Sequence, residues 1–466
     1  MELEVVKTPA KTEAGSYFVA NYPPFSAWKP EYIHAAQAIL DASSDVAAIR
    51  PSLLRRSVVP SHPLDPSAPR PLGPSPLGLY LHIPFCRKRC KFCYFRVYTD
   101  KNASEVDTYM DALAREIALY KDKPRLAGRQ FEFVYFGGGT PSFLSNDQLK
   151  RLIERINRHW RWDAAREVTF ECEPGTLKQS KLEAIKSIGV TRLSLGIEHW
   201  DDEILELNGR AHRSKEIGIA YDWARTVGFK QINVDLIAGM VGETEDKWKL
   251  AVERTLALQP DSVTIYQMEL PFNTVFTKEM QAAGGQSPVA DWATKRRWAS
   301  WAFEQFEGAG YVVSSGYTLV KPGPHSSFVY RDALWHGGDM VGTGVASFSH
   351  VGGVHYQNLD KWEDYLTSIN GGRLPLSRAL PISDRQRLIR EWVLQTKLGR
   401  LDFAYFREKF GVEPTVEFAA AINELKSSGD ATVDGDRLTL SRDALLRVDT
   451  LLPAFFESEF RGVRYT

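Results

Sequence analysis

The stretch "GLYLHIPFCRKRCKFC" (78–93) runs from a short apolar segment directly into a cluster of cysteines. Its first half, "GLYLHIPF", predicts a β-strand. Its second half holds three of the four cysteines of this 466-residue chain, Cys86, Cys90 and Cys93, among basic side chains. In parallel α/β folds, ligands bind at the carboxyl ends of the strands. A strand that ends in three thiols therefore indicates a site as well as a fold.

The three clustered thiols allow several interpretations. Four cysteines do not form a disulfide framework, and pairing Cys90 with Cys93 would leave Cys86 unmatched. Zinc usually takes four ligands, and the fourth would have to come from a distant histidine. Three thiolates suit an iron–sulfur cluster with one iron left open. The spacing favours the cluster, with a zinc site and a purely structural role as the alternatives.

Beyond this loop, short apolar runs alternate with helical patterns. We predict six strands, at 78–85, 131–138, 167–174, 192–199, 232–239 and 262–269. Helical patterns separate them, at 104–121, from 145 onward, and at 177–187, 214–227 and 245–257. Because β-then-α units build parallel sheets, the sequence predicts an α/β fold, an incomplete (β/α)6 barrel with its helices outside. The strands are apolar on both faces, as a covered parallel sheet requires.

Three regions are predicted along the chain. Residues 1–77 form a proline-rich arm, interrupted by a short helix within 30–43. Residues 78–375 form the partial barrel. Residues 376–466 form a small, mainly helical unit, in which a helix precedes a hairpin as in winged-helix folds.

Composition excludes several classes of partner. The 58 basic and 58 acidic residues cancel, which removes any global argument for nucleic acid or an anionic membrane. No run of about 18 apolar residues indicates a membrane span. The first residues lack the layout of a secretory signal, so we expect a cytoplasmic protein.

Unusual residues gather where the predicted strands end. Three glycines (137–139) let the backbone approach a ligand and form a nest of N–H donors. Asp235 lies within an apolar strand, where an unpaired carboxylate is costly, and Arg210 is a candidate partner. Cys172 is expected to be a buried, inert thiol. Six consecutive strands thus deliver polar residues to one rim.

The pattern C-x3-C-x2-C, with Phe92 before the last cysteine, resembles the radical SAM superfamily. More specifically, the sequence resembles the coproporphyrinogen III dehydrogenase-like (HemN-like) family. The matching stretches include "YLHIPFC", "YFGGGTPSFL", "FECEPGTL", "RLSLGIEHWDDEILELNGRAH", "NVDLIAGMVGET" and "GTGVASFS".

This resemblance implies a [4Fe–4S] cluster on Cys86, Cys90 and Cys93, with S-adenosylmethionine (SAM) on the open iron. Cleavage of SAM would give a 5′-deoxyadenosyl radical. The cluster-bound SAM would contact Tyr80, Gly138, Glu171 and Phe348. A second SAM would lie against Phe92, Gly139, Thr140, Arg210 and Asp235. The electron would come from a reductant such as flavodoxin or ferredoxin.

Three departures from the family pattern bear on the reaction: Phe95, Glu198 and Glu269 replace a cysteine, a glutamine and an alanine. We therefore expect C-methylation or cyclopropanation of an aromatic or conjugated substrate, with the second SAM as carbon donor. Glu198, Glu269 and Tyr266 are the candidate catalytic residues. The alternatives are oxygen-independent coproporphyrinogen III dehydrogenation, with a tetrapyrrole substrate, and a heme chaperone-like carrier. The stretch "YRDALW" (330–335) keeps only the tryptophan of the chaperones' H-N-x-x-Y-W motif, which disfavours the carrier.

Overall fold

The computed structural model describes residues 18–43, 75–271, 273–282 and 287–463. Its centre is a set of parallel strands that pair in chain order. These are β1 (Leu77–Ile83), β2 (Phe131–Gly138), β3 (Glu167–Cys172), β4 (Arg192–Glu198), β5 (Gln231–Ala238) and β6 (Ser262–Gln267). The predicted α/β class and its six βα units are confirmed. The barrel is incomplete, because β1 pairs with β9 on its free side and β6 pairs with β8.

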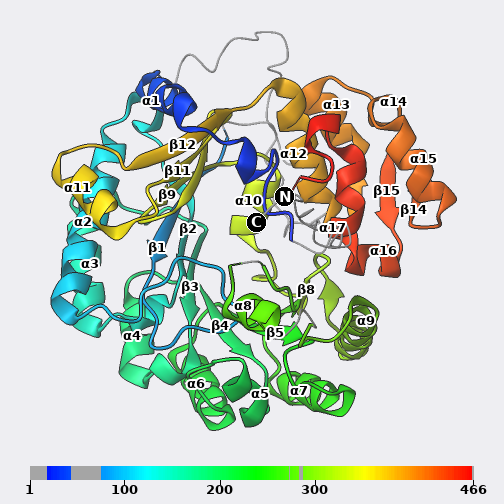
Figure 1. Cartoon of the computed structure of the whole chain (residues 1–466), viewed down its shortest axis with the longest axis horizontal. Helices are drawn as coiled ribbons and strands as arrows, with labels where there is room; N and C mark the ends of the chain where they lie inside the picture. Colours follow the sequence, from blue (N-terminus) through cyan, green and yellow to red (C-terminus); the bar gives the residue numbers. More distant parts are fainter. Residues whose placement is uncertain (1–17, 44–74, 272, 283–286, 464–466) are drawn as a thin grey trace, which may run out of the picture.

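Helices follow the strands and cover the outside of the curved sheet, as Figure 1 shows. They are α2 (Ala103–Lys121), α3 (Asn146–Asn157), α4 (Gln179–Ser187), α5 (Asp202–Leu207), α6 (Ser214–Val227), α7 (Glu245–Leu258) and α9 (Trp292–Gly308). The short α8 (Val275–Ala282) lies against the cysteine loop instead, where the Phe276 N–H donates to the Lys91 carbonyl (3.1 Å). Capping boxes begin two of them: Asn102 with Glu105 before α2, and Ser145 with Gln148 before α3. The helix start predicted at Ser145 is therefore confirmed.

The sheet continues past both edges of the six predicted strands. On one side lie β9 (Asp339–Thr343), β10 (Phe348–Val351), β11 (Val354–Asn358) and β12 (Leu376–Pro381). Along the chain, α10 (Val329–Trp335) precedes β9, and α11 (Trp362–Asn370) connects β11 to β12. On the other lie β8 (Thr318–Val320) and β7 (Val312–Val313). The glycines of this region allow close approach, because a Cβ on Gly342 would lie 2.1 Å from the carbonyl oxygen of Phe348.

The C-terminal region builds a second apolar core around the fully buried Trp392. Its helices are α12 (Asp384–Thr396), α13 (Phe403–Phe410), α14 (Pro414–Glu417), α15 (Ala419–Ser427), α16 (Arg442–Leu446) and α17 (Val448–Leu451). A small sheet joins β13 (Arg400–Asp402), β14 (Ala431–Asp434) and β15 (Arg437–Leu440). The predicted helix followed by a hairpin is confirmed as α15, β14 and β15. The domain limits themselves stay a prediction.

The described part of the N-terminal arm joins these two bodies. Its predicted helix is α1 (Ile33–Asp41), and Lys29 forms a bridge with Ala379 of β12. Tyr22 is fully buried in the C-terminal core. Most of the second proline-rich stretch (58–76) lies outside the described residues. None of the helices in the described ranges is long and apolar enough to cross a membrane.

Candidate active site and metal centre

The cysteine loop begins directly after β1, at the carboxyl edge of the parallel strands. All three cysteines are free and partly exposed, whereas Cys172 is buried, as expected. Two backbone hydrogen bonds shape the loop: the Cys86 N–H donates to the Tyr98 carbonyl (3.0 Å), and the Cys93 N–H donates to the Cys90 carbonyl (3.1 Å). The loop thus presents three thiols from one short segment.

Two of the three sulfurs have hydrogen-bond donors. The Thr140 hydroxyl donates to Cys86 Sγ (3.4 Å), and Arg210 Nη1 donates to Cys90 Sγ (3.3 Å). Burial raises the pKa of the Cys86 thiol to about 11 and that of Cys93 to about 12. These two thiols therefore keep their protons until a metal cation displaces them.

The donor set fits an iron–sulfur cluster. Within the parts of the chain that the structure describes, no three His, Cys, Asp or Glu side chains lie close enough together to hold one metal ion directly. A cluster spaces its thiolates more widely than a single ion does, since each thiolate binds a different iron. Hydrogen bonds to the sulfurs, like those from Thr140 and Arg210, are a feature by which proteins adjust such clusters.

Tyr80, Gly138 and Glu171 lie together on neighbouring strands. The Gly138 N–H donates to Glu171 Oε2 (3.3 Å), and the Tyr135 hydroxyl donates to Glu171 Oε1 (2.7 Å). The rings of Tyr80 and Tyr135 stack with centroids 5.8 Å apart. Gly138 has φ 114°, a conformation that disfavours any side chain. Burial raises the pKa of Glu171 to about 7.

The structure corrects the predicted partner of Asp235. Its carboxylate accepts hydrogen bonds from the Ser194 hydroxyl (3.0 Å) and from Asn233 Nδ2 (2.8 Å), not from Arg210. The three residues lie on adjacent strands β4 and β5, so side chains on one sheet face satisfy the carboxylate. Burial raises the pKa of Asp235.

Arg210 instead lies between a cysteine and Glu198. Its Nη1 is 3.5 Å from Glu198 Oε1, and its Nη2 donates to the Gly196 carbonyl (2.5 Å). Burial raises the pKa of Glu198 to about 7. The predicted second-SAM residues Arg210 and Asp235 are thus held by different partners.

The other two candidate catalytic residues lie in different surroundings. Tyr266, at the end of β6, keeps 42% of its surface exposed. Its pKa is raised by desolvation and by the nearby carboxylates of Asp235, Glu171 and Glu198. Glu269 accepts a hydrogen bond from the Phe18 N–H (3.1 Å). Burial and Asp449 raise the pKa of Glu269 to about 8. Glu269 therefore contacts the N-terminal arm and neighbours the C-terminal region.

The remaining predicted residues lie around the same rim. The Gly139 N–H donates to the Ile83 carbonyl (2.8 Å), which ties the glycine loop to β1. Phe92 packs against a small apolar cluster of Ile204, Ile237, Met240 and Met268. Phe348 is covered by the N-terminal arm, with its ring centroid 4.3 Å from that of Phe25 and 5.6 Å from that of Trp28.

Sequence reasoning missed the residues that hold the carboxylates. Tyr135, Ser194 and Asn233 each donate to an acidic side chain at the strand ends. The sequence held a signal for one of these contacts. Asn233 and Asp235 are two residues apart on one strand, so their side chains lie on the same face of the sheet. The same alternation puts Tyr135 on the face of Gly137.

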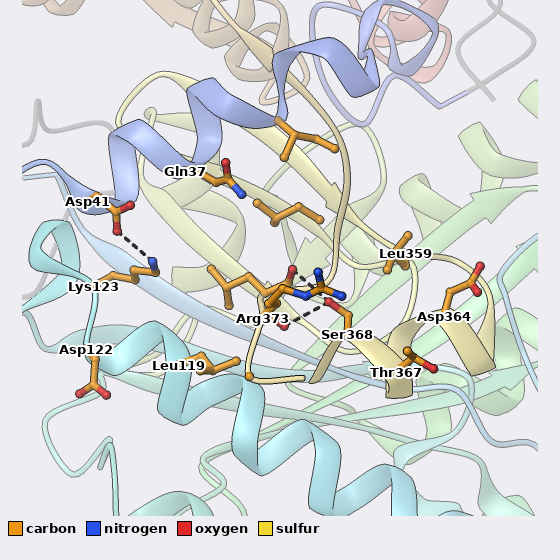
Figure 2. A pocket seen from close by; sticks show the side chains of 14 residues that line it. Gln37, Asp41, Leu119, Asp122, Lys123, Leu359, Asp364, Thr367, Ser368 and Arg373 are labelled. Carbon is orange, nitrogen blue, oxygen red and sulfur yellow. Dashed lines mark hydrogen bonds and ion pairs between the residues drawn. The ribbon is translucent and has the colours of Figure 1, made fainter. Parts of the chain in front are cut away.

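A cavity also lies away from the cysteine rim. It has a volume of about 770 Å³ and opens on the outside of the molecule, between α1, α2 and α11. Figure 2 shows its charged lining, with Lys123 paired to Asp41 and Arg373 close to Ser368. None of the predicted site residues lines it. The chemistry of the cysteine rim, rather than this cavity, identifies the candidate site.

The chain is similar to known proteins over most of its length. Residues 80–254, which run from β1 into α7, match the family model of the Radical SAM superfamily. The chain is 28% identical to the oxygen-independent coproporphyrinogen III oxidase of Pseudomonas aeruginosa over 415 residues, which are 83% of this chain and 88% of that protein. It is 26% identical to the heme chaperone HemW of Bacillus subtilis over 352 residues, 75% of this chain and 91% of that one.

A solved structure shares the whole fold. Coproporphyrinogen III oxidase (HemN) from Escherichia coli, a radical SAM enzyme, aligns with a TM-score of 0.76 at 21% identity. The alignment covers 94% of this chain and 96% of that one, so it includes the C-terminal region as well as the partial barrel.

Proposed function

We propose a reaction for this chain on the premise that it belongs to the radical SAM superfamily, in its HemN/HemW-like family. Cys86, Cys90 and Cys93 would hold a [4Fe–4S] cluster. With SAM bound, that cluster supplies a 5′-deoxyadenosyl radical that removes a hydrogen atom from a substrate. The observation that carries the proposal is the loop of three thiols at the end of β1, with donors on two of its sulfurs.

The chain's own residues position and shield this chemistry. Glu171, fixed by Tyr135 and Gly138, offers a carboxylate beside the loop for an amino group or ribose hydroxyls. The glycine loop lets a nucleotide approach the backbone. The N-terminal arm covers Phe348 with two aromatic rings and so limits access of water on that side.

We infer that the substrate is a tetrapyrrole and that the reaction is oxidative decarboxylation of coproporphyrinogen III. The relatives named above are coproporphyrinogen III oxidases and heme chaperones, and none of them supports the methyl transfer expected from the sequence. Exposed aromatic rings at the rim favour a large, flat-ringed substrate. Tyr94 and Phe95 on the cysteine loop stack 4.6 Å apart and are 43% and 45% exposed, and Tyr266 lies on β6.

The test is anaerobic reconstitution with iron and sulfide, followed by incubation with SAM, a reductant and coproporphyrinogen III. We expect bound iron and sulfide, 5′-deoxyadenosine, and a decarboxylated porphyrinogen. Formation of S-adenosylhomocysteine in place of the decarboxylated porphyrinogen would show methyl transfer. Tight heme binding without SAM cleavage would show a carrier.

Matched cysteine variants make this test specific. Cys90→Ala should abolish 5′-deoxyadenosine formation while the circular dichroism spectrum stays native. Cys172→Ala removes a thiol outside the loop and should retain activity. If Cys90→Ala still produced 5′-deoxyadenosine at the wild-type rate, the cluster assignment would be wrong.

A further inference from the structure

The ion pair of Arg210 and Glu198 lies next to the sulfur of Cys90. Arg210 Nη1 is 3.3 Å from Cys90 Sγ and 3.5 Å from Glu198 Oε1. The side chains of Arg210 and Glu198 are only 11% and 12% exposed. Charges this well shielded from water and salt act strongly on a neighbouring centre.

The backbone places Glu198 in an unusual way. Its φ is 63°, in the left-handed region that residues other than glycine rarely adopt. The register of β4 against β5 shifts between Gly196 and Glu198, a bulge that re-aims the side chain. Strain of this kind concentrates at functional sites, where the surrounding structure maintains it.

The position of Arg210 is equally constrained. Its Nη2 donates to the Gly196 carbonyl, and a Cβ on Gly196 would lie 2.9 Å from Glu198 Oε1. One residue before Arg210, a Cβ on Gly209 would lie 3.1 Å from the Arg89 carbonyl oxygen. The Lys91 N–H also donates to the Asn208 carbonyl (3.1 Å). The segment that carries Arg210 is therefore packed onto the cysteine loop.

We propose that Arg210 and Glu198 set the reduction potential of the cluster, Arg210 by raising it and Glu198 by lowering it. Reduction adds negative charge to the cluster and its thiolates. A cationic N–H donor on a ligand sulfur favours the reduced form, and a nearby carboxylate opposes it. This tuning rests on the proposed function and is separate from the second-SAM contact that the sequence predicts for Arg210.

The test compares Arg210→Gln and Glu198→Gln above pH 8, where Glu198, with its pKa of about 7, is ionised. Each substitution removes one charge of the pair and keeps a polar side chain. The midpoint potential of the reconstituted cluster is measured without SAM, by redox titration followed with paramagnetic resonance. At a fixed solution potential, we expect the ratio of reduced to oxidised cluster to fall about tenfold in Arg210→Gln, the size of one charge-assisted hydrogen bond. A tenfold change corresponds to about 59 mV for a one-electron couple. In Glu198→Gln the ratio should rise.

Glu206→Gln is the matched control. It removes a carboxylate from the nearby α5, but this side chain is 68% exposed and pairs with Arg213, so its removal should leave the potential unchanged. Opposite shifts in the two test variants support the proposal, because a merely structural role would not give opposite signs.

Shifts of the same sign, or shifts no larger than that of Glu206→Gln, would overturn the tuning role. If Arg210→Gln does not retain the cluster, Arg210→Lys serves as a variant that keeps the positive charge. The direction of the shift in midpoint potential in Glu198→Gln then decides the proposal by itself. A wild-type protein that binds no iron and sulfide would overturn the proposed function as well. A normal wild-type cluster with unshifted variants would reject only the tuning.

Discussion

Three acidic side chains on the neighbouring strands β3, β4 and β5 share one electrostatic property, a raised pKa. Glu171, Glu198 and Asp235 are partly buried, and burial raises the pKa of each. An opposite charge nearby favours the ionised form of a carboxyl group. A ligand that brings a sulfonium and an ammonium group, as SAM does, would therefore be attracted to this rim.

Asp235→Asn tests the second nucleotide position. The amide keeps the shape of the carboxylate but removes its charge, so binding of a second SAM should weaken by about tenfold, the loss of one charged hydrogen bond. Formation of 5′-deoxyadenosine should persist. Equilibrium dialysis with labelled SAM would count the bound molecules. Asp261→Asn is the control, because the Asp261 carboxylate pairs with Arg225 of α6. This variant should bind SAM as the wild type does.

Equal loss of both SAM molecules in Asp235→Asn would contradict this assignment.

At the scale of single residues, the sequence predicted which strand ends carry polar groups, but it mispaired Asp235 with Arg210. The partner of a buried carboxylate depends on which side chains of adjacent strands share its face. That depends on the register of β4 and β5, including a bulge that no local pattern reveals.

At the scale of elements, one helix residue joins the barrel to its added strands. Glu116 of α2 is fully buried and accepts hydrogen bonds from the Gly344 N–H (2.7 Å), Asn358 Nδ2 (2.6 Å) and the Tyr365 hydroxyl (2.7 Å). These partners come from the turn after β9, from β11 and from α11. The contacts therefore hold α2 against the part of the sheet that the sequence did not predict.

Burial raises the pKa of Glu116 to about 7, above that of an unfolded glutamate, despite three donors. Its contribution to stability is therefore fully present below the unfolded pKa and is lost as the pH rises through about 7. Urea unfolding at pH values from 5 to 8 should show a declining free energy of unfolding in the wild type, by about 1–3 kcal/mol from this group. Glu116→Gln should flatten the decline, whatever its effect on absolute stability. An unchanged slope in the variant would reject the assignment.

The six predicted strands of the parallel sheet are rich in apolar residues, and all six are confirmed. Several of the strands that were not predicted are short or glycine-rich. β9 and β10 lie within a stretch whose glycines weaken strand propensity, yet Gly342 is needed where the backbone of Phe348 passes close by. Such strands form because they pair with an adjacent strand, and the local sequence does not show which strand that is.

At the scale of the whole molecule, the N-terminal arm, the partial barrel and the C-terminal region meet at one buried cluster. The Val19 N–H donates to Asp449 Oδ1 (2.9 Å), and Lys397 Nζ lies 2.8 Å from the same oxygen. Lys397 also lies over the Phe18 ring, 3.5 Å from its centroid. Figure 1 shows the C-terminal helices beside the open side of the barrel. The cluster joins segments more than 400 residues apart in sequence.

Asp449→Asn should destabilise this junction. It leaves the fully buried ammonium of Lys397 without its carboxylate, and breaking a buried pair in this way costs about 3–5 kcal/mol. Urea unfolding and limited proteolysis would measure the loss. Asp443→Asn, which breaks an exposed pair with Arg447, should cost at most about 1 kcal/mol. Equal stability of the two variants would show that the junction contributes little.

The α/β class, the six parallel strands and the loop of three thiols can be predicted from the amino-acid sequence, because apolar periodicity and cysteine spacing are local properties. Only the tertiary structure decided which side chains meet at the rim: Arg210 with Cys90 and Glu198, Asp235 with Ser194 and Asn233, and Glu269 with the arm. Three of those contacts join residues far apart in the chain: Arg210 with Cys90, Asp235 with Ser194, and Glu269 with Phe18. They depend on strand register, on a left-handed residue in β4 and on how three regions pack, and none of these is encoded in a short window of sequence.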